Sequence, residues 1–338
     1  MPNARPNFPF VRNQNNIYVP VLPNLGLELP FIPGNIWHVR PRYGHDLNNN
    51  GLRPDSAFKT PEKAFDKMVA DQNDVLLLYS ESNSASLTTS LLSTTLTWSK
   101  NLCHLIGVGS ANPFSSRARV AWASAAASDS DIPLINVTGS GCLFRNVSFV
   151  VGSSDANLSF GLAVSGDRNR FERISVANPT NAANDVAGAY SLYLNGCTDS
   201  IFEDCNFGSY TIDMGSAANS VLLVAGGGSL TKFRRCLFIN RIEHGTNSPL
   251  VSIPAATGVG FGCLFFEDRC GFISTSVNGA YSQTGAFKVG AAQNDGKVII
   301  DPTCYTNATK WDSQDANQIL IAGPATPAAD TVNVMLAV

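Results

Sequence analysis

The sequence has little charge and no long apolar run. Only 14% of its 338 residues are charged, against roughly 25% in ordinary soluble domains. No stretch approaches the roughly 18–20 consecutive apolar residues of a membrane-spanning helix. The first residues, MPNARPNFPF, have neither the basic nor the apolar region of a secretion signal. We therefore expect no membrane partner and synthesis in a host cytoplasm.

The chain also lacks a strong charge of either sign. Its net charge is −3, and no alternation of basic and aromatic residues suggests nucleic acid binding. The charge is unevenly spread, because residues 1–54 hold five arginines against only Glu28 and Asp46. A basic N-terminal segment on an acidic remainder suits an arm that lies on a neighbouring subunit.

Metal and redox motifs are missing. The eight cysteines form no C-x-x-C pair and the four histidines show no metal-binding spacing. We expect reduced cysteines, buried as small hydrophobes, and no cofactor. Asp46, Asn48 and Asn50 match the first half of an EF-hand loop, but Ala57 stands where the bidentate Glu is required. An Asx-rich turn is the simpler interpretation, and a calcium ion on those three residues is the alternative.

Residues 1–43 combine repeated Pro and Asn with scattered aromatics. Proline every few residues forbids a helix interior or a central strand, yet the aromatic content is too high for a disordered segment. We predict an extended assembly arm that buries its apolar side chains on a partner. The anchors expected on this arm are Phe8, Phe10, Tyr18, Phe31 and Trp37.

Residues 44–73 predict a capping segment with one short helix. Thr60 and Pro61 read as the N-cap and first helical position. Ala64, Phe65 and Met68 supply an apolar stripe at helical spacing, so we expect a helix over 61–71 and then a strand over 75–79.

A repeat begins at about residue 74. Short apolar strands end at Gly139, Gly166, Gly196 and Gly226, at spacings of 27, 30 and 30 residues. A second strand follows each glycine, as FRNVSF, FERISV, FEDCNF, FRRCLF and, with one extra residue, FEDRCGF. The first phenylalanines of these five copies are Phe144, Phe171, Phe202, Phe233 and Phe266.

This period predicts an all-β, single-stranded right-handed parallel β-helix. No unit can close a core alone, so the units must stack with like residue on like residue, which makes an internal ladder of the five phenylalanines. We assign the β-helix to 74–322 and a C-terminal tail, ending in a strand, to 323–338. Helical solenoids are excluded because no unit has helical periodicity, and propeller blades need about 40 residues.

The segment GHDLNNNGLRPDSAFKTPEKAF (44–65) and the repeat resemble the pectin-lyase-like parallel β-helix proteins. The resemblance covers roughly residues 40–322 and concerns fold, without a catalytic signature. It implies one of several roles: polysaccharide lyase or hydrolase, bacterial adhesin, or bacteriophage tailspike, fibre or decoration protein.

Candidate catalytic residues are few. Cleavage of a polysaccharide needs carboxylates grouped on one face, and Glu172, Glu203 and Asp204 follow the ladder phenylalanines in register. Arg234 and Arg235 occupy the same positions one coil later, as expected of a solvated face with cross-strand ion pairs. We therefore expect no catalytic site, with these three acids as the suspects if the protein is an enzyme.

Three functional hypotheses follow. The first is a non-enzymatic virion protein, a capsid decoration or tail or fibre component, bound to capsid or tail subunits through its arm and trimeric by analogy. The second is a carbohydrate-binding or carbohydrate-cleaving β-helix of the tailspike type, whose partner is a cell-surface glycan. The third is a bacterial surface adhesin, which requires a secretion route.

Overall fold

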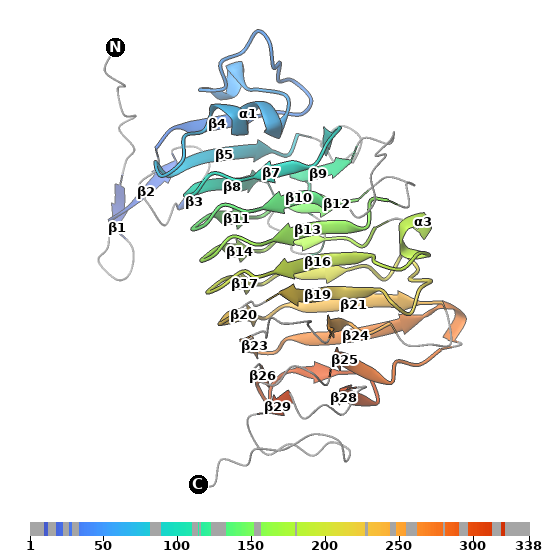
Figure 1. Cartoon of the computed structure of the whole chain (residues 1–338). Coiled ribbons are helices and arrows are strands. Elements are labelled where there is room, and N and C mark those ends of the chain that lie inside the picture. The colour runs from blue at the N-terminus through green and yellow to red at the C-terminus, as the bar shows by residue number, and fades with distance from the viewer. Residues whose placement is uncertain are drawn as a thin grey trace.

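The computed structural model describes residues 10–12, 18–22, 27–28, 34–81, 89–109, 114, 116–122, 133–151, 157–179, 181–226, 229–243, 248–254, 262–279, 281–290, 297–312 and 319–321. Its body is a column of stacked coils, with the first coils at one end and the last at the other (Figure 1). The chain is a right-handed parallel β-helix, as the repeat predicts, built of three parallel sheets.

Each full coil contributes one strand to each sheet in turn. Sheet 1 has eight strands, in sequence order β7 (Leu96–Trp98), β10 (Pro133–Val137), β13 (Phe160–Val164), β16 (Tyr190–Asn195), β19 (Ser220–Gly226), β22 (Val251–Ile253), β25 (Gly285–Val289) and β28 (Lys310–Asp312).

Sheet 2 has ten strands: β4 (Ile36–Val39), β5 (Asp74–Tyr79), β8 (Cys103–Val108), β11 (Leu143–Arg145), β14 (Arg170–Glu172), β17 (Ile201–Glu203), β20 (Thr231–Arg234), β23 (Cys263–Glu267), β26 (Lys297–Ile300) and β29 (Ile319–Ile321).

Sheet 3 has eight strands: β6 (Thr89–Leu92), β9 (Arg119–Trp122), β12 (Ser148–Val150), β15 (Ser175–Val176), β18 (Asn206–Gly208), β21 (Leu237–Ile242), β24 (Gly271–Ser276) and β27 (Tyr305–Thr306). Outside the coils, β1 (Phe10–Arg12), β2 (Tyr18–Leu22) and β3 (Leu27–Glu28) form a small antiparallel sheet.

Helical structure is sparse among the described residues. The helix α1 (Pro61–Lys67) starts at Thr60, whose Oγ1 accepts from the amide of Lys63 at 3.4 Å. It is shorter than the predicted 61–71, because Met68 already has extended backbone. The remaining helical segments are single turns: η1 (Pro54–Ser56), α3 (Asn181–Asn184) and η2 (Val277–Gly279).

The helix α1 closes the first coil. Ala64, Phe65 and Met68 belong to the main core, and the ring of Phe65 lies 4.4 Å from that of Trp98. An end of a β-helix that is left open would expose both apolar core and unpaired backbone groups. The capping role predicted for this segment therefore has a structural basis.

The second strand of each repeat is in fact two strands that meet at a corner. FRNVSF divides into β11 and β12, and Asn146 between them has φ of 56°. Phe144 and Phe149 are both fully buried although they lie five residues apart, a spacing that puts side chains on opposite faces of a straight strand. A left-handed residue turns the chain so that both rings point inward.

The same corner recurs in every coil of the repeat. The corner residues with positive φ are Asn146, Arg173, Asp204 and Arg235, followed by the pair Asp268 and Arg269. The last pair accommodates the extra residue of FEDRCGF. Each corner amide bonds to the next coil, as Asp204 does to the carbonyl of Arg234 at 3.0 Å, so the turns continue the ladder of the sheets.

Aromatic and thiol ladders fill the core. Phe144, Phe171, Phe202, Phe233 and Phe266 stack in register with ring centroids 4.5 to 5.0 Å apart. Cys205, Cys236, Cys270 and Cys304 are also buried, and each thiol donates to a backbone carbonyl of the preceding coil at 3.4 Å. Burial raises the pKa of Cys236 well above its ordinary value, so its thiol stays protonated.

Candidate functional site

The candidate carboxylates lie on the outer face of sheet 2. In β14 and β17 the ladder phenylalanines point inward, so by strand alternation Glu172 and Glu203 point outward. The two glutamates are directly opposite each other in register. The structure thus brings two of the three suspects onto one face, and Asp204 follows at the corner.

Arginines separate the two glutamates. Glu172 accepts from Arg145 and from Arg170, each at 2.5 Å. Arg170 also reaches Glu203 at 2.8 Å. The two carboxylates are therefore bridged by a guanidinium, the arrangement expected of cross-strand ion pairs.

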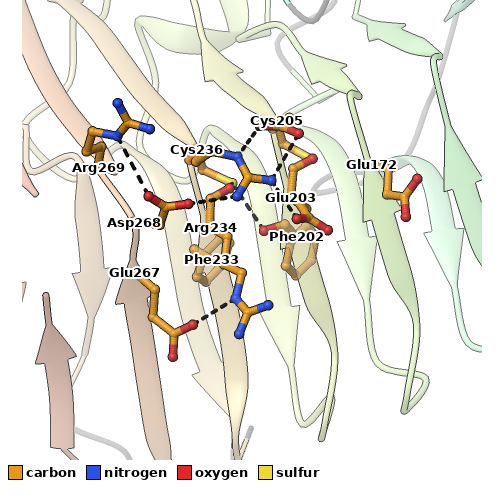
Figure 2. A network of polar contacts seen from close by, with 12 residues as sticks. Glu172, Phe202, Glu203, Cys205, Phe233, Arg234, Cys236, Glu267, Asp268 and Arg269 are labelled. Atoms are coloured by element: carbon orange, nitrogen blue, oxygen red, sulfur yellow. Dashed lines mark hydrogen bonds and ion pairs between the residues drawn. The ribbon is translucent and has the colours of Figure 1, made fainter. Parts of the chain in front are cut away.

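Arg235 holds a cluster of acids at the corner. Its guanidinium pairs with Glu203 at 2.5 Å, with Asp204 at 2.7 Å and with Asp268 at 2.7 Å. In Figure 2, Glu203 and Asp268 flank the strand that carries Arg234, which itself pairs with Glu267 at 2.8 Å. The network runs over several coils and alternates in charge.

The electrostatics oppose general acid catalysis. Desolvation alone would raise the pKa of Glu203, but its hydrogen bond with Arg235 and the charge of Arg170 hold that pKa below its ordinary value. A glycosidase acid needs a carboxyl whose pKa is raised, so that it still carries a proton at neutral pH. Glu203 has the opposite setting, and this ion-pair network supplies no acid for cleavage.

The Asp46 turn satisfies its own polar groups. Asp46 accepts from the amides of Lys59 at 2.7 Å and Thr60 at 3.1 Å, and from the Thr60 hydroxyl at 3.0 Å. Asn50 accepts from the amide of Leu52 at 3.1 Å. The side-chain oxygens that a calcium ion would need from Asp46 and Asn50 are thus engaged in shaping the turn. Within the described residues, no group of three His, Cys, Asp or Glu could hold a metal ion.

The first coils carry a second apolar cluster, on the outer face of sheet 2. In β5 the side chains of Leu76 and Leu78 belong to the main core, whereas Val75 and Leu77 alternate with them and point outward. We define the outer apolar patch by the residues of this cluster: Ile36, Val75, Leu77, Ile106 and Leu143, with Tyr79 and Val108 packed against them.

The outer apolar patch is completely covered. Val75, Leu77 and Ile106 each have 0% exposed surface, although they face away from the core of the coils. His104 lies on the same face between Val75 and Leu143 and is 3% exposed. The sequence analysis missed this patch. Its signal was DVLLLY (74–79), a continuous apolar run, which is typical of a parallel strand buried on both faces.

The predicted arm anchors fall in different places. Phe10 lies in β1 and Tyr18 in β2, while Phe8 and Phe31 lie outside the described residues. Trp37 is not on an arm. It sits in β4, paired in parallel with β5, stacks on Phe58 at 6.1 Å and donates to Asp74 at 3.2 Å.

The solenoid therefore begins at Ile36, earlier than the boundary expected after residue 43. A strand that supplies parallel hydrogen bonds to β5 belongs to the sheet, whatever the proline content of the residues before it. The expected C-terminal tail, 323–338, lies outside the described residues.

Comparison with known proteins establishes the fold and no more. No family model matches the chain, and no curated protein matches it. Among solved structures it is similar to pectate lyase Pel9A, with a TM-score of 0.55 and 12% identity over 86% of this chain and 68% of that chain. It is also similar to the pectin methylesterase PemA from Erwinia chrysanthemi, with a TM-score of 0.52 and 14% identity over 90% of this chain and 93% of that one.

A weaker likeness is to ORF18 of Geobacillus virus E2, with a TM-score of 0.44 and 11% identity over 75% of this chain and 54% of that chain. The chain therefore shares the right-handed β-helix fold of the pectin-lyase-like proteins, as the repeat and the segment 44–65 predict. Within the described residues, no helix is long and apolar enough to cross a membrane.

Proposed function

We propose that the protein is a non-catalytic structural subunit of a bacteriophage virion, a capsid decoration or tail component, and that its N-terminal arm joins it to neighbouring copies. The observation that carries this proposal is the outer apolar patch. A solvated face of a β-helix has no use for Val75, Leu77 and Ile106, each with 0% exposed surface. A contiguous apolar surface outside the core marks an interface.

The arm, residues 1–33, is the segment suited to this patch. It is rich in apolar and aromatic residues and in proline, and it directly precedes β4, where the patch begins. The strands β1–β3 make a sheet too small to be stable alone. They are drawn toward the same end of the column as β4 and β5 (Figure 1).

Exchange between copies is the step from fold to assembly. The patch has no exposed surface in the single chain, so the same chain covers it. When an identical segment is exchanged between copies, each copy keeps the same contacts and an oligomer forms at little cost. A homotrimer is the stoichiometry that we propose, by analogy with other phage β-helices.

The free cysteines favour a virion protein over a surface adhesin. All eight cysteines are free, and seven of them are buried. A ladder of neighbouring thiols such as Cys205, Cys236 and Cys270 suits a protein that folds in a reducing cytoplasm. An exported adhesin would fold where such thiols oxidise.

The carbohydrate-cleaving alternative has the fold in its favour, since the similar structures are pectin enzymes. At 12–14% identity this likeness concerns fold alone. The suspected acids of this chain are bound to arginines, and the pKa of Glu203 is held low. The structural role therefore has the stronger support.

Light scattering on the full chain and on a variant that lacks residues 1–33 tests the proposal. This truncation leaves β4 intact. We expect a defined oligomer for the full chain, and a smaller species that binds an apolar dye for the truncated chain, because the patch is then uncovered. Equal masses for the two, both monomeric, would contradict the proposal.

Point variants guard against a truncation that fails to fold. Phe8→Ser with Phe31→Ser in the full chain should lower the oligomer mass while the far-ultraviolet spectrum stays unchanged. Tyr305→Ser is the matched control, since its ring is 50% exposed near the opposite end of the column. It should leave the mass as it is.

A further inference from the structure

A groove runs along the outer face of sheet 3, away from the ion-pair network and from the outer apolar patch. It has a volume of about 380 Å³ and crosses β12, β15 and β18. Its floor is made of small side chains that follow one another in register, with Ser148 next to Ser175 and Ser175 next to Asn206. Gly208 continues the floor, and its φ of 92° suits glycine alone.

The floor is polar and buried. Ser148 is 1% exposed and Ser175 is 6% exposed, and their hydroxyl oxygens lie 2.5 Å apart. Asn206 is 8% exposed, and its Oδ1 has no hydrogen-bond partner among the described residues. A buried acceptor without a partner costs about 1–3 kcal/mol. This cost is recovered only if something that enters the groove donates to it.

The remaining lining adds aromatic and cationic groups. Tyr210 and Phe114 line the groove and are 67% and 61% exposed, which is high for rings with no solvent role. Arg119 lies in register with Ser148, and its Nε donates to the carbonyl of Ser116 at 3.0 Å. No carboxylate is among the described residues that line the groove.

We propose that this groove binds an oligosaccharide without cleaving it. Sugar hydroxyls both donate and accept, so one ligand can donate to Asn206 Oδ1 and accept from Arg119. The exposed rings of Tyr210 and Phe114 offer apolar platforms for the faces of sugar rings. With an arginine and no acid in the lining, the groove suits neutral or uronic-acid sugars. The absence of a lining carboxylate removes the pair needed for hydrolysis.

This inference does not rest on the proposed structural role. A virion subunit with such a groove would attach to a surface glycan, yet the groove would bind sugar equally if the arm never exchanged. The two proposals have separate readouts, which are oligomer mass for the arm and glycan binding for the groove.

The test is an array of immobilised neutral and uronic-acid oligosaccharides, probed with the purified full chain and two groove variants. Tyr210→Ala removes a ring platform from an exposed position. Asn206→Leu removes the unpartnered acceptor and places leucine next to Leu237, which occupies the same position one coil later. We expect the wild type to bind at least one glycan class and each variant to lose about tenfold or more in affinity.

Tyr305→Ala is the matched control, because its ring is exposed in the last strand of the same sheet. It should bind as the wild type does. Absence of wild-type binding across the array would overturn the proposal, as would binding that ignores both groove variants. If Tyr210→Ala changes the oligomer mass and leaves glycan binding intact, the groove is a subunit interface and the proposal is wrong. Unchanged thermal midpoints exclude misfolding as the cause of any loss.

Discussion

Arg235 and Glu203 form an ion pair across two coils, with nitrogen and oxygen 2.5 Å apart. The same guanidinium pairs with Asp204 and Asp268, so one cation neutralises three acids drawn from three successive coils. A residue that resembles a catalytic carboxylate in the sequence is therefore part of the electrostatic stitching of the stack.

This stitching predicts the effect of removing the cation. Arg235→Met leaves three neighbouring acids without it, and we expect a loss of about 1–3 kcal/mol in the free energy of unfolding, from three partly exposed pairs. Arg234→Met is the control. It abolishes one pair, with Glu267, and should cost less than about 1 kcal/mol. Urea unfolding measures both, and equal losses would refute the clustered role of Arg235.

Burial of His104 predicts a dependence of stability on pH. Desolvation lowers the pKa of His104 to about 4, and its Nδ1 accepts from the amide of Leu143 at 3.0 Å. The unfolded chain therefore binds more protons than the folded one between pH 4 and the ordinary value of 6.5, so stability falls as pH falls through this window.

The same holds for His38, whose pKa burial also lowers to about 4. We expect the thermal midpoint to drop between pH 6.5 and 4, less so in His104→Gln, and least in the double variant His38→Gln, His104→Gln. An unchanged slope in the double variant would show that other groups carry the acid dependence.

Glu62 predicts an effect of the opposite sign. Desolvation raises its pKa to about 7, and its Oε2 is buried without a hydrogen-bond partner among the described residues. The folded chain then binds more protons than the unfolded one between pH 4.5 and 7, so this group contributes stability at low pH that is lost as pH rises through the window. Glu62→Gln should stabilise the protein at pH 8 and have little effect at pH 5. A gain that is equal at both pH values would contradict this account.

The phenylalanine ladder predicts a large cost for a cavity. Phe202 is fully buried and stacks on Phe171 at 4.5 Å and on Phe233 at 4.8 Å. Phe202→Ala should cost about 3–5 kcal/mol in urea unfolding. Phe114→Ala, at a ring 61% exposed, should cost far less. A small loss at Phe202 would mean that the coils on either side collapse into the cavity.

Much of this fold is predictable from the sequence because a β-helix repeats its physics. The spacing of the glycines and of Phe144, Phe171 and Phe202 specifies the coil, and stacking then specifies the ladder. The last coil shows where the repeat loses its signal. The strand at 318–321 resembles those of sheet 1, yet β29 pairs with β26 in sheet 2, while Lys310–Asp312 takes the place in sheet 1.

Other features depend on geometry that no pattern of types reveals. Left-handed corners fall on Asn146, Arg173 and Asp204, residue types that do not announce a turn as glycine does. The groove on sheet 3 arises from small side chains of three coils, and only the register brings Ser148, Ser175 and Asn206 together. The acids of sheet 2 were predicted to be ion-paired, but the sharing of Arg235 by three of them required the corner geometry.

The most direct test of the central claim is a cross-linking experiment on mixed copies. A photoreactive residue replaces Leu77 in the outer apolar patch, and copies grown with nitrogen-14 are mixed with copies grown with nitrogen-15, then unfolded and refolded together. If arms are exchanged, mass spectrometry will find peptides of residues 1–33 from one isotope cross-linked to the patch of the other. If every cross-link joins arm and patch of the same isotope, the arm covers only its own chain and the assembly role is wrong.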